Sequence, residues 1–434
     1  MSTNATNAPA ADGTIEFPCH GCGRELKVPV TASGKQAKCP QCNAVQTVPA
    51  VTTPPVATGM QAMQPPAPMS FAPAPPVEAS TEADGQLHSS NVFTTNIRPE
   101  PPQPGKLAVP AIHEGRDTPT KLLFDRMTAE IAKIYVGQDE LVLGALTALF
   151  SSGHVLIESV PGLGKTLFVR VLGRVLGLNF GRIQFTADLM PSDITGAPIF
   201  DLKQQEFRFR PGPVFTQILL ADEINRSPAK THAALLEIMQ EYRVTIDGVS
   251  HPIQRPFLVL ATQNPIESEG TYNLPEAQLD RFMFKLVANY PTEHEESNIL
   301  KLHSQQVDIN QRLENEVQTI TSQEEISATI RSNSEVRIDD KLVDYINKLV
   351  RRTRQNPQYF YMGASPRAGI ALMQASRTLA AFHGRDYAVP DDVVQNALPA
   401  LRHRVSLTAE AEVEGHKVDA LLTELIRSVE VPRL

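Results

Sequence analysis

The stretch that decides the fold is Ser159-Val160-Pro161-Gly162-Leu163-Gly164-Lys165-Thr166. It fits the phosphate-loop pattern G-x-x-x-x-G-K-[ST] at every fixed position except the first, where Ser159 replaces glycine. Gly162 and Gly164 allow the backbone to curl, so that successive N–H groups can face phosphate oxygens at the start of a helix. The pattern predicts that Lys165 reaches the β- and γ-phosphates of ATP and that Thr166 ligates Mg²⁺. The other residues predicted to line the nucleotide here are Val160, Pro161, Leu163 and Leu167.

The segments around this loop predict an α/β domain. His154–Glu158 is a short apolar strand before the loop, and Lys165–Leu176 is a helix after it, which Gly177 is placed to end. Continuous apolar strands, each followed by a turn and a helix, are typical of a parallel sheet covered on both faces. The other elements predicted for this domain are strands at Gln217–Asp222 and Phe257–Thr262 and helices at Lys121–Val136 and Asp139–Phe150.

Two acids end the second predicted strand. In Ile218-Leu219-Leu220-Ala221-Asp222-Glu223 an apolar run leads directly into Asp222 and Glu223. Asp222 is placed to hold the Mg²⁺ shell, and Glu223 to orient and activate the attacking water. Taken alone, the segment is also compatible with a buried strand that ends in solvated acids. The phosphate loop upstream makes a nucleotide-hydrolysing site the better interpretation.

Several motifs together resemble AAA+ ATPases and, within them, the MoxR family, over roughly residues 120–434. In chain order they are Val-Pro-Gly-Leu-Gly-Lys-Thr (160–166), Ala-Asp-Glu-Ile-Asn-Arg (221–226), Ala-Thr-Gln-Asn-Pro (261–265), Leu-Pro-Glu-Ala-Gln-Leu-Asp-Arg-Phe (274–282) and Gly-Ala-Ser-Pro-Arg (363–367). The set is specific, whereas any one member is not.

The resemblance implies roles for four further places. Asn264 would be the polar sensor that helps to position the water, and Arg281 the arginine finger that reaches the γ-phosphate of the neighbouring subunit. Arg367 would contact the nucleotide from its own lid, and Val136-Gly137-Gln138 would lie near the adenine. Each also has an ordinary alternative: Asn264 as a turn residue, and the two arginines as surface cations at helix ends. A finger in trans implies a homo-oligomeric ring, for which the family expectation is a hexamer.

The rest of the second half of the chain is predicted to be helical. Ser365-Pro366 offers an N-cap followed by proline at the first helical position, and Gly384 sits where that helix would stop. The predicted helices are near Glu293–His303, Asp339–Arg354, Ser365–His383 and Pro390–Arg402. The expected organisation is a zinc ribbon at 13–50, a disordered proline-rich linker at 51–119, an α/β nucleotide-binding core at 120–291 and a small all-helical lid at 292–434.

Two hairpins are predicted as insertions in the α/β core. Ile199–Arg210 would place Phe207 and Phe209 on one face of a strand, and Val244–Val249 contains an Asp-Gly turn. In the resembled family such insertions line the pore side of the ring. The alternative is that these hairpins are ordinary surface elements without a specific function.

All four cysteines lie near the N-terminus, in Cys19-His20-Gly21-Cys22 and Cys39-Pro40-Gln41-Cys42. Two C-x-x-C pairs at this spacing predict a four-thiolate zinc site, which is structural because cysteines fill every ligand position. Gly23 and Asn43 follow the pairs and tolerate the left-handed backbone of such knuckles. The module resembles bacterial zinc ribbons. The alternative, disulfides or free thiols, is less compatible with a chain that has no signal-peptide pattern.

Composition limits the remaining possibilities. The chain has 434 residues and 35 prolines, and the stretch from Pro49 to about Pro119 is too poor in aliphatic residues to form a core. A net charge of −8 argues against a protein that coats nucleic acid or anionic lipid. Because there is neither a secretory signal nor a long apolar run, a cytoplasmic protein with no membrane span is expected.

The leading hypothesis is a Mg²⁺-dependent ATPase ring that remodels or matures a client protein. In related systems the usual partner carries a von Willebrand A-type domain. The alternative from a different class is an AAA+ module that binds nucleic acid through the zinc ribbon, although nucleic acid is an unlikely partner for so acidic a chain. A scaffold that binds ATP without hydrolysing it would not need Lys165, Asp222, Glu223 and Arg281 together.

Overall fold

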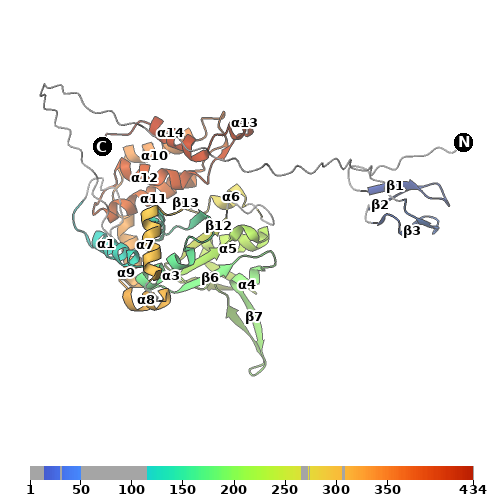
Figure 1. Cartoon of the computed structure of the whole chain (residues 1–434), viewed down its shortest axis with the longest axis horizontal. Helices are drawn as coiled ribbons and strands as arrows, with labels where there is room; N and C mark the ends of the chain where they lie inside the picture. The colour runs from blue at the N-terminus through green and yellow to red at the C-terminus, as the bar shows by residue number, and fades with distance from the viewer. Residues whose placement is uncertain are drawn as a thin grey trace, which may run out of the picture. The chain divides into compact units, whose positions relative to one another are not determined.

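The computed structural model (Figure 1) describes residues 14–29, 32–49, 115–264, 272, 274–304 and 308–433. The chain divides into two compact units, one in the first 95 residues and the other from Asn96 onward. Of the linker predicted at 51–119, residues 51–114 lie outside the described part of the chain. Among the described residues, no helix combines the length and apolar character needed to cross a membrane.

The N-terminal unit consists of two short hairpins. Strand β1 (Thr14–Pro18) pairs with β2 (Glu25–Pro29), and β3 (Gln36–Lys38) pairs with β4 (Val45–Thr47), both antiparallel. Its buried apolar set is small and contains Phe17, Leu26 and Val48 together with two cysteines. So little apolar burial cannot offset much ordering entropy.

The second unit is built on a five-stranded parallel sheet. The strands lie in the order β13 (Phe284–Ala288), β5 (Val155–Ser159), β12 (Leu258–Gln263), β9 (Ile218–Asp222) and β6 (Phe180–Gln184). The strands predicted from apolar runs are those at the centre of the sheet, and each lies within one residue of its predicted bounds.

Both faces of the sheet are buried, which is why its central strands are apolar throughout. Ile218 and Leu220 belong to a cluster with α1 (Pro119–Ala132), α2 (Asp139–Phe150) and α3 (Lys165–Leu176). The alternate residues of the same strand pack against α4 (Pro191–Thr195) and α5 (Ala229–Glu241). Successive side chains of a strand point to opposite faces, so a sheet covered on both sides needs a continuous apolar run.

Both predicted hairpins are present. Strand β7 (Gly196–Asp201) pairs with β8 (Glu206–Pro211) and projects from the body of its unit (Figure 1), with Phe207 74% exposed. Strand β10 (Arg243–Ile246) pairs with β11 (Val249–Pro252) through Asp247 and Gly248, which both have positive φ. Two successive left-handed residues are the requirement of a tight hairpin turn and explain the Asp-Gly sequence.

The segment after Pro291 is helical, with one correction to the prediction that strands stop there. A two-stranded ladder joins β14 (Phe360–Met362) to β15 (Ser406–Leu407). These strands are too short to give a recognisable alternating pattern. The helices are α7 (Glu293–Ser304), α8 (Ile309–Glu316), α9 (Gln323–Ser334), α10 (Asp340–Arg352), α11 (Pro366–Phe382), α12 (Pro390–Leu401), α13 (Ala409–Val413) and α14 (Val418–Ser428), preceded by the short α6 (Glu276–Leu279).

This helical part, called the lid below, shares its core with the first helices of the unit. The ring of Phe382 in α11 stacks on Phe124 at 4.3 Å and meets Phe150 edge-on at 5.5 Å between centroids. Nearby, the hydroxyls of Ser151 and Thr378 are 2.8 Å apart. The lid is therefore anchored to α1 and α2 by a buried aromatic contact.

Candidate active site

The phosphate loop connects β5 to α3, as the sequence predicts. Gly162 and Gly164 have φ of +88° and +71°, a left-handed backbone that other residues adopt only with strain. Lys165 and Thr166 are the first two residues of α3, so their side chains lie at the positive end of a helix. Ser159 is buried at the end of β5, and its hydroxyl has no hydrogen-bond partner within the described residues. The loop is shaped to receive an anion.

The two predicted acids lie at the carboxyl end of β9 and are held by one residue of the next strand. Thr262 donates a hydrogen bond from its hydroxyl to Asp222 Oδ1 at 2.7 Å. The Thr262 hydroxyl oxygen in turn accepts the backbone N–H of Glu223 at 2.9 Å, and Glu223 itself has a left-handed φ of 57°. Thr262 thereby holds one carboxylate oxygen of Asp222 and the backbone of Glu223. A polar residue in an apolar strand was the available signal for Thr262, which the sequence analysis did not single out.

Strand β6 supplies partners for both acids that the sequence analysis also missed. Arg182 forms an ion pair with Asp222 Oδ2 at 2.7 Å. Gln184 donates to Glu223 Oε2 at 2.7 Å, and Arg226 pairs with the same carboxylate at 3.2 Å. Both acids are therefore engaged by protein groups here. A ligand that needs their oxygens must exchange with these contacts.

The register of the sheet aligns the predicted site residues at one edge. Gln263 lies opposite Glu158 on β5, and Ala261 lies opposite Ala221 on β9. The phosphate loop, Asn264 and the two acids consequently leave three neighbouring parallel strands at the same end. Ligands of open parallel sheets bind at this edge. Asn264 is 8% exposed.

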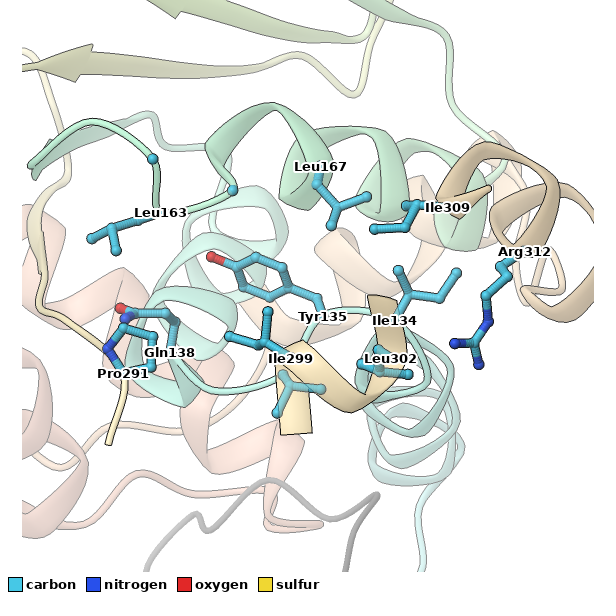
Figure 2. Close-up of a pocket in the computed structure, with 13 residues that line it drawn as sticks. Ile134, Tyr135, Gln138, Leu163, Leu167, Pro291, Ile299, Leu302, Ile309 and Arg312 are labelled. Carbon is cyan, nitrogen blue, oxygen red and sulfur yellow. The ribbon is translucent and has the colours of Figure 1, made fainter. Parts of the chain in front are cut away.

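Beside the phosphate loop lies a cavity of about 180 Å³ (Figure 2). One wall comes from the turn after α1, a helix that ends at Ala132, four residues earlier than predicted. Within this turn Gly137 and Gln138 both have positive φ. The other walls come from Gly162 to Gly164, Leu167 and residues of α7 and α8. Val136 and Gln138, two of the three residues that the resemblance predicts near the adenine, line this cavity. The lining residues not anticipated from the sequence include Ile134, Tyr135, Pro291, Ile299, Leu302 and Ile309.

The cavity is mostly apolar, and its few polar side chains differ in their partners. Gln138 donates to the carbonyl of Asn289, and Arg312 holds Glu316 in a two-bond ion pair of 2.9 and 2.8 Å. Tyr135 is buried, and within the described residues its hydroxyl has no partner. Burial raises the pKa of this hydroxyl, which therefore stays neutral. An apolar cavity next to an anion-binding loop can hold the base of a nucleotide.

The two predicted arginines lie on segments that meet at Asp280. Arg281 follows Asp280, just after α6, and Arg367 is the second residue of α11. The Arg367 guanidinium is 51% exposed and approaches Asp280 at 4.0 Å. Within the described part of the chain, the Nε of Arg281 is buried without a partner.

The four cysteines come together in the N-terminal unit, where all are free thiols. Their sulfur atoms all lie within 4.8 Å of one another, with 3.5 Å between Cys19 and Cys42 and 3.8 Å between Cys22 and Cys39. Four thiolates about 2.3 Å from a tetrahedral Zn²⁺ are spaced by just under 4 Å, so this cluster fits zinc. Gly23 and Asn43 have the predicted left-handed backbone.

Backbone N–H groups also favour thiolates in this cluster. The N–H groups of Cys42 and Gln41 donate to Cys39 and lower its pKa to about 6, whereas hydrogen bonds with the neighbouring thiols, Cys19 first, raise the pKa of Cys42. Gly21 donates its N–H to Cys19 Sγ at 3.4 Å. A thiolate is the form that binds metal.

Comparison with known proteins identifies the second unit. Residues 154–284 match the model of the ATPase family associated with various cellular activities (AAA), and residues 351–425 match an AAA lid domain. The chain is 45% identical to the uncharacterized protein YeaC of Bacillus subtilis and 42% identical to the chaperone MoxR1 of Mycobacterium tuberculosis. Each match covers 71% of this chain, with 95% of YeaC and 82% of MoxR1. The chain belongs to the MoxR family of AAA+ ATPases.

A solved structure agrees with this MoxR-family assignment. A putative ATPase from Cytophaga hutchinsonii is 39% identical, with a TM-score of 0.67 over 72% of this chain and 96% of that one. The MoxR-family unit is thus an ATPase, with a parallel sheet and a helical lid as predicted from the sequence. The cysteine cluster lies outside the residues that the two family models match.

Proposed function

We propose that this ATPase works as a homo-oligomeric ring, a hexamer by family expectation, and uses Mg²⁺-dependent ATP hydrolysis to remodel or mature a client protein. The observation that carries the proposal is the alignment of the phosphate loop, Asp222, Glu223 and Asn264 at one edge of the sheet. The chaperone name of MoxR1 supports the client role. Within the described residues nothing favours the nucleic-acid alternative.

In this proposal each residue has a defined task. Lys165 and the N–H groups of the loop hold the phosphates, and Thr166 and Asp222 supply the oxygen ligands that Mg²⁺ prefers. When bound, the ion neutralises charge on the phosphates. Glu223 accepts a proton from the attacking water, which Asn264 helps to orient. Thr262 supports this arrangement by donating to the Asp222 carboxylate and by accepting the backbone N–H of Glu223.

Among the described residues, an unpartnered guanidinium nitrogen of Arg281 supports the ring. An arginine finger must leave its own subunit's contacts to stabilise charge on a γ-phosphate next door. Within the described residues, the Nε of Arg281 has no partner. Arg367, half-exposed at the start of α11, would contact the nucleotide of its own subunit. A partner with a von Willebrand A-type domain and a cytoplasmic location complete the proposal.

Two substitutions test the chemistry. Lys165→Ala should lose nucleotide binding, because the charge between the phosphates is gone. Glu223→Gln should retain ATP and stop turnover, because water activation is lost while binding survives. Nucleotide retention and phosphate release should be measured on the same samples. Hydrolysis by Glu223→Gln at the wild-type rate would remove Glu223 from the catalytic role.

Mixing two inactive variants tests the ring. Arg281→Ala should bind ATP and hydrolyse it about 10³-fold more slowly, because a finger stabilises the transition state more than the ground state. Lys165→Ala subunits lack a working site but still offer an intact finger. Mixed rings should therefore regain activity where an intact Arg281 meets an intact loop. If subunits exchange and activity stays absent at every ratio, the finger does not act in trans.

The client role is tested with Glu223→Gln as bait. In the presence of ATP the trapped ring should retain a protein that the Lys165→Ala ring, which cannot bind nucleotide, releases. A von Willebrand A-domain protein among the retained partners supports the specific proposal. Equal recovery with both baits would argue against nucleotide-controlled client binding.

A further inference from the structure

Asp280, the residue before Arg281, is bound from the lid by two residues. The Ser365 hydroxyl lies 2.9 and 2.8 Å from its two carboxylate oxygens. Arg404, just after α12, donates from Nε to Asp280 Oδ1 at 2.8 Å. Ser365 is also the N-cap of α11 and accepts the N–H of Arg367. The carboxylate therefore joins the segment that carries Arg281 to the helix that carries Arg367.

The lid also holds the backbone on both sides of Arg281. The Arg404 guanidinium, 4% exposed, donates to the carbonyls of Asp280 at 3.2 Å, Phe282 at 2.6 Å and Met283 at 3.0 Å. His403 Nε2 lies 3.0 Å from the same Phe282 carbonyl. The residues after Arg281 are also held by the sheet core, where Phe282 is buried and Met283 donates its N–H to the His154 carbonyl at 2.8 Å. The direction in which the Arg281 side chain leaves the chain therefore depends on the position of the lid relative to this core.

The contacts of Asp280 differ in how easily they can be given up. The Arg404 charge is buried, and losing Asp280 would leave it without its ion-pair partner, which is costly in a protein interior. Arg367 is half-exposed and 4.0 Å away, so its attraction is weak and screened. A nucleotide could therefore take Arg367 away from Asp280 while Arg404 keeps its hold.

We propose that Asp280 is a positioning residue through which the lid of one subunit sets the arginine finger that this subunit offers to its neighbour. The inference rests on the trans role of Arg281 proposed above. If Asp280 acts in this way, the position of the lid on the ATP of one subunit influences the rate of hydrolysis in the neighbouring subunit. A purely structural Asp280 would instead hold the lid and core of its own site together, and its loss would damage that site.

The test is Asp280→Asn, which keeps the shape and removes the charge. The variant ring should hydrolyse ATP about 10- to 100-fold more slowly, as expected for a misplaced catalytic group, with ATP affinity within about threefold of wild type. The matched control is Asp386→Asn, which removes a carboxylate paired with Arg337 on the surface, both strongly exposed. The control should hydrolyse ATP at the wild-type rate.

Mixed rings separate positioning from structural damage. An Asp280→Asn subunit has an intact phosphate loop, so Lys165→Ala subunits, which lend an intact finger, should restore its activity. Arg281→Ala subunits should not, because neither variant then offers a working finger. Failure of Lys165→Ala to rescue Asp280→Asn, in rings where it does rescue Arg281→Ala, would overturn this inference and leave the trans finger standing. Failure of both rescues would overturn the trans finger itself.

A second variant covers the case in which Asp280→Asn does not fold. Ser365→Gly removes the hydroxyl that bonds to Asp280, while glycine is well tolerated at an N-cap. It should show the same rescue pattern with a smaller loss of activity. Wild-type hydrolysis by Ser365→Gly, or rescue by Arg281→Ala and Lys165→Ala alike, would contradict a positioning role.

Discussion

The cysteine module at residues 14–49 and the ATPase unit at 115–433 are stabilised in different ways. The module has a handful of buried apolar side chains and four thiols gathered at one point. The ATPase unit buries both faces of its sheet under helices. The module should depend on a metal for its fold, whereas the ATPase unit should fold without its ligand. The ATPase unit can therefore tolerate buried polar groups without a hydrogen-bond partner at its nucleotide site, such as, in the described part of the chain, the hydroxyls of Ser159 and Tyr135.

The largest effect expected from this difference is the unfolding of the cysteine module when its metal site is disrupted. Cys22→Ser should remove the zinc and unfold residues 14–49, because a fold of about forty residues has little else to stabilise it. The wild-type chain should carry about one zinc per protomer by metal analysis. Thermal unfolding of the ATPase unit should be unchanged in the variant. If amide exchange shows that the module is folded without metal, its stability does not depend on the metal.

A smaller effect is expected from a buried histidine in the ATPase unit. His154 accepts the N–H of Val259 at 3.1 Å and lies 3.1 Å from the Met239 carbonyl. Burial lowers its pKa from 6.5 to about 4. Its folded state therefore prefers the neutral ring, so stability is full above about pH 6.5 and is lost as the pH falls towards 4, by about 3 kcal/mol in all.

The matched variant for this prediction is His154→Gln, whose amide can accept from Val259 and donate to Met239 but does not titrate. Denaturant unfolding at pH 7 and pH 4 gives the free energy of unfolding of both proteins. The wild-type value should fall by about 3 kcal/mol more than that of the variant. Equal falls would show that His154 keeps its ordinary pKa in the fold.

A third prediction concerns the unpartnered hydroxyl in the nucleotide cavity. Tyr135→Phe should raise the free energy of unfolding of the nucleotide-free protein by about 1 kcal/mol, because a buried donor without a partner is removed. The same measurement with ATP shows whether the nucleotide supplies the missing acceptor: the gain then shrinks or reverses. A destabilised nucleotide-free variant would mean that the hydroxyl already has a partner, such as water.

The smallest effect is expected from separating the two units. Gly115 and Arg116 donate their N–H groups to His383 and Gly384 at 2.8 and 3.0 Å, so a cut must leave them in place. Removal of residues 1–114 should then change the steady-state ATPase rate by less than about twofold, because a proline-rich linker transmits little force. A large change in this rate would show that the module acts on the site.

Local features of this chain were predictable because they follow from backbone geometry. The left-handed positions at Gly23, Asn43 and Gly164 were visible from residue type, as was the N-cap at Ser365. Helix α3 has the predicted bounds because a glycine lies on each side of it. The fold class followed from these signals together with the apolar strands.

Contacts between distant segments were not predictable in the same way. Arg404 looks like any charged residue at a helix end, and its bonds to Asp280 and Met283 join positions more than a hundred residues apart. Helix α8 was missed because it is short and buries only Leu313, which gives no helical apolar pattern. Likewise Arg182 became meaningful only when the strand order placed β6 next to β9.

The contact between the lid and the first helices has a consequence for synthesis on the ribosome. Ser151 and Thr378, which meet beside the stacked rings of Phe124 and Phe382, are separated by 227 positions. At about 5–20 residues per second, roughly 10–45 s pass between the emergence of α2 and that of its partner helix. Throughout that interval the nascent chain exposes the apolar faces of α1 and α2 to holdase chaperones and proteases, so the yield of this ATPase should be sensitive to the supply of both.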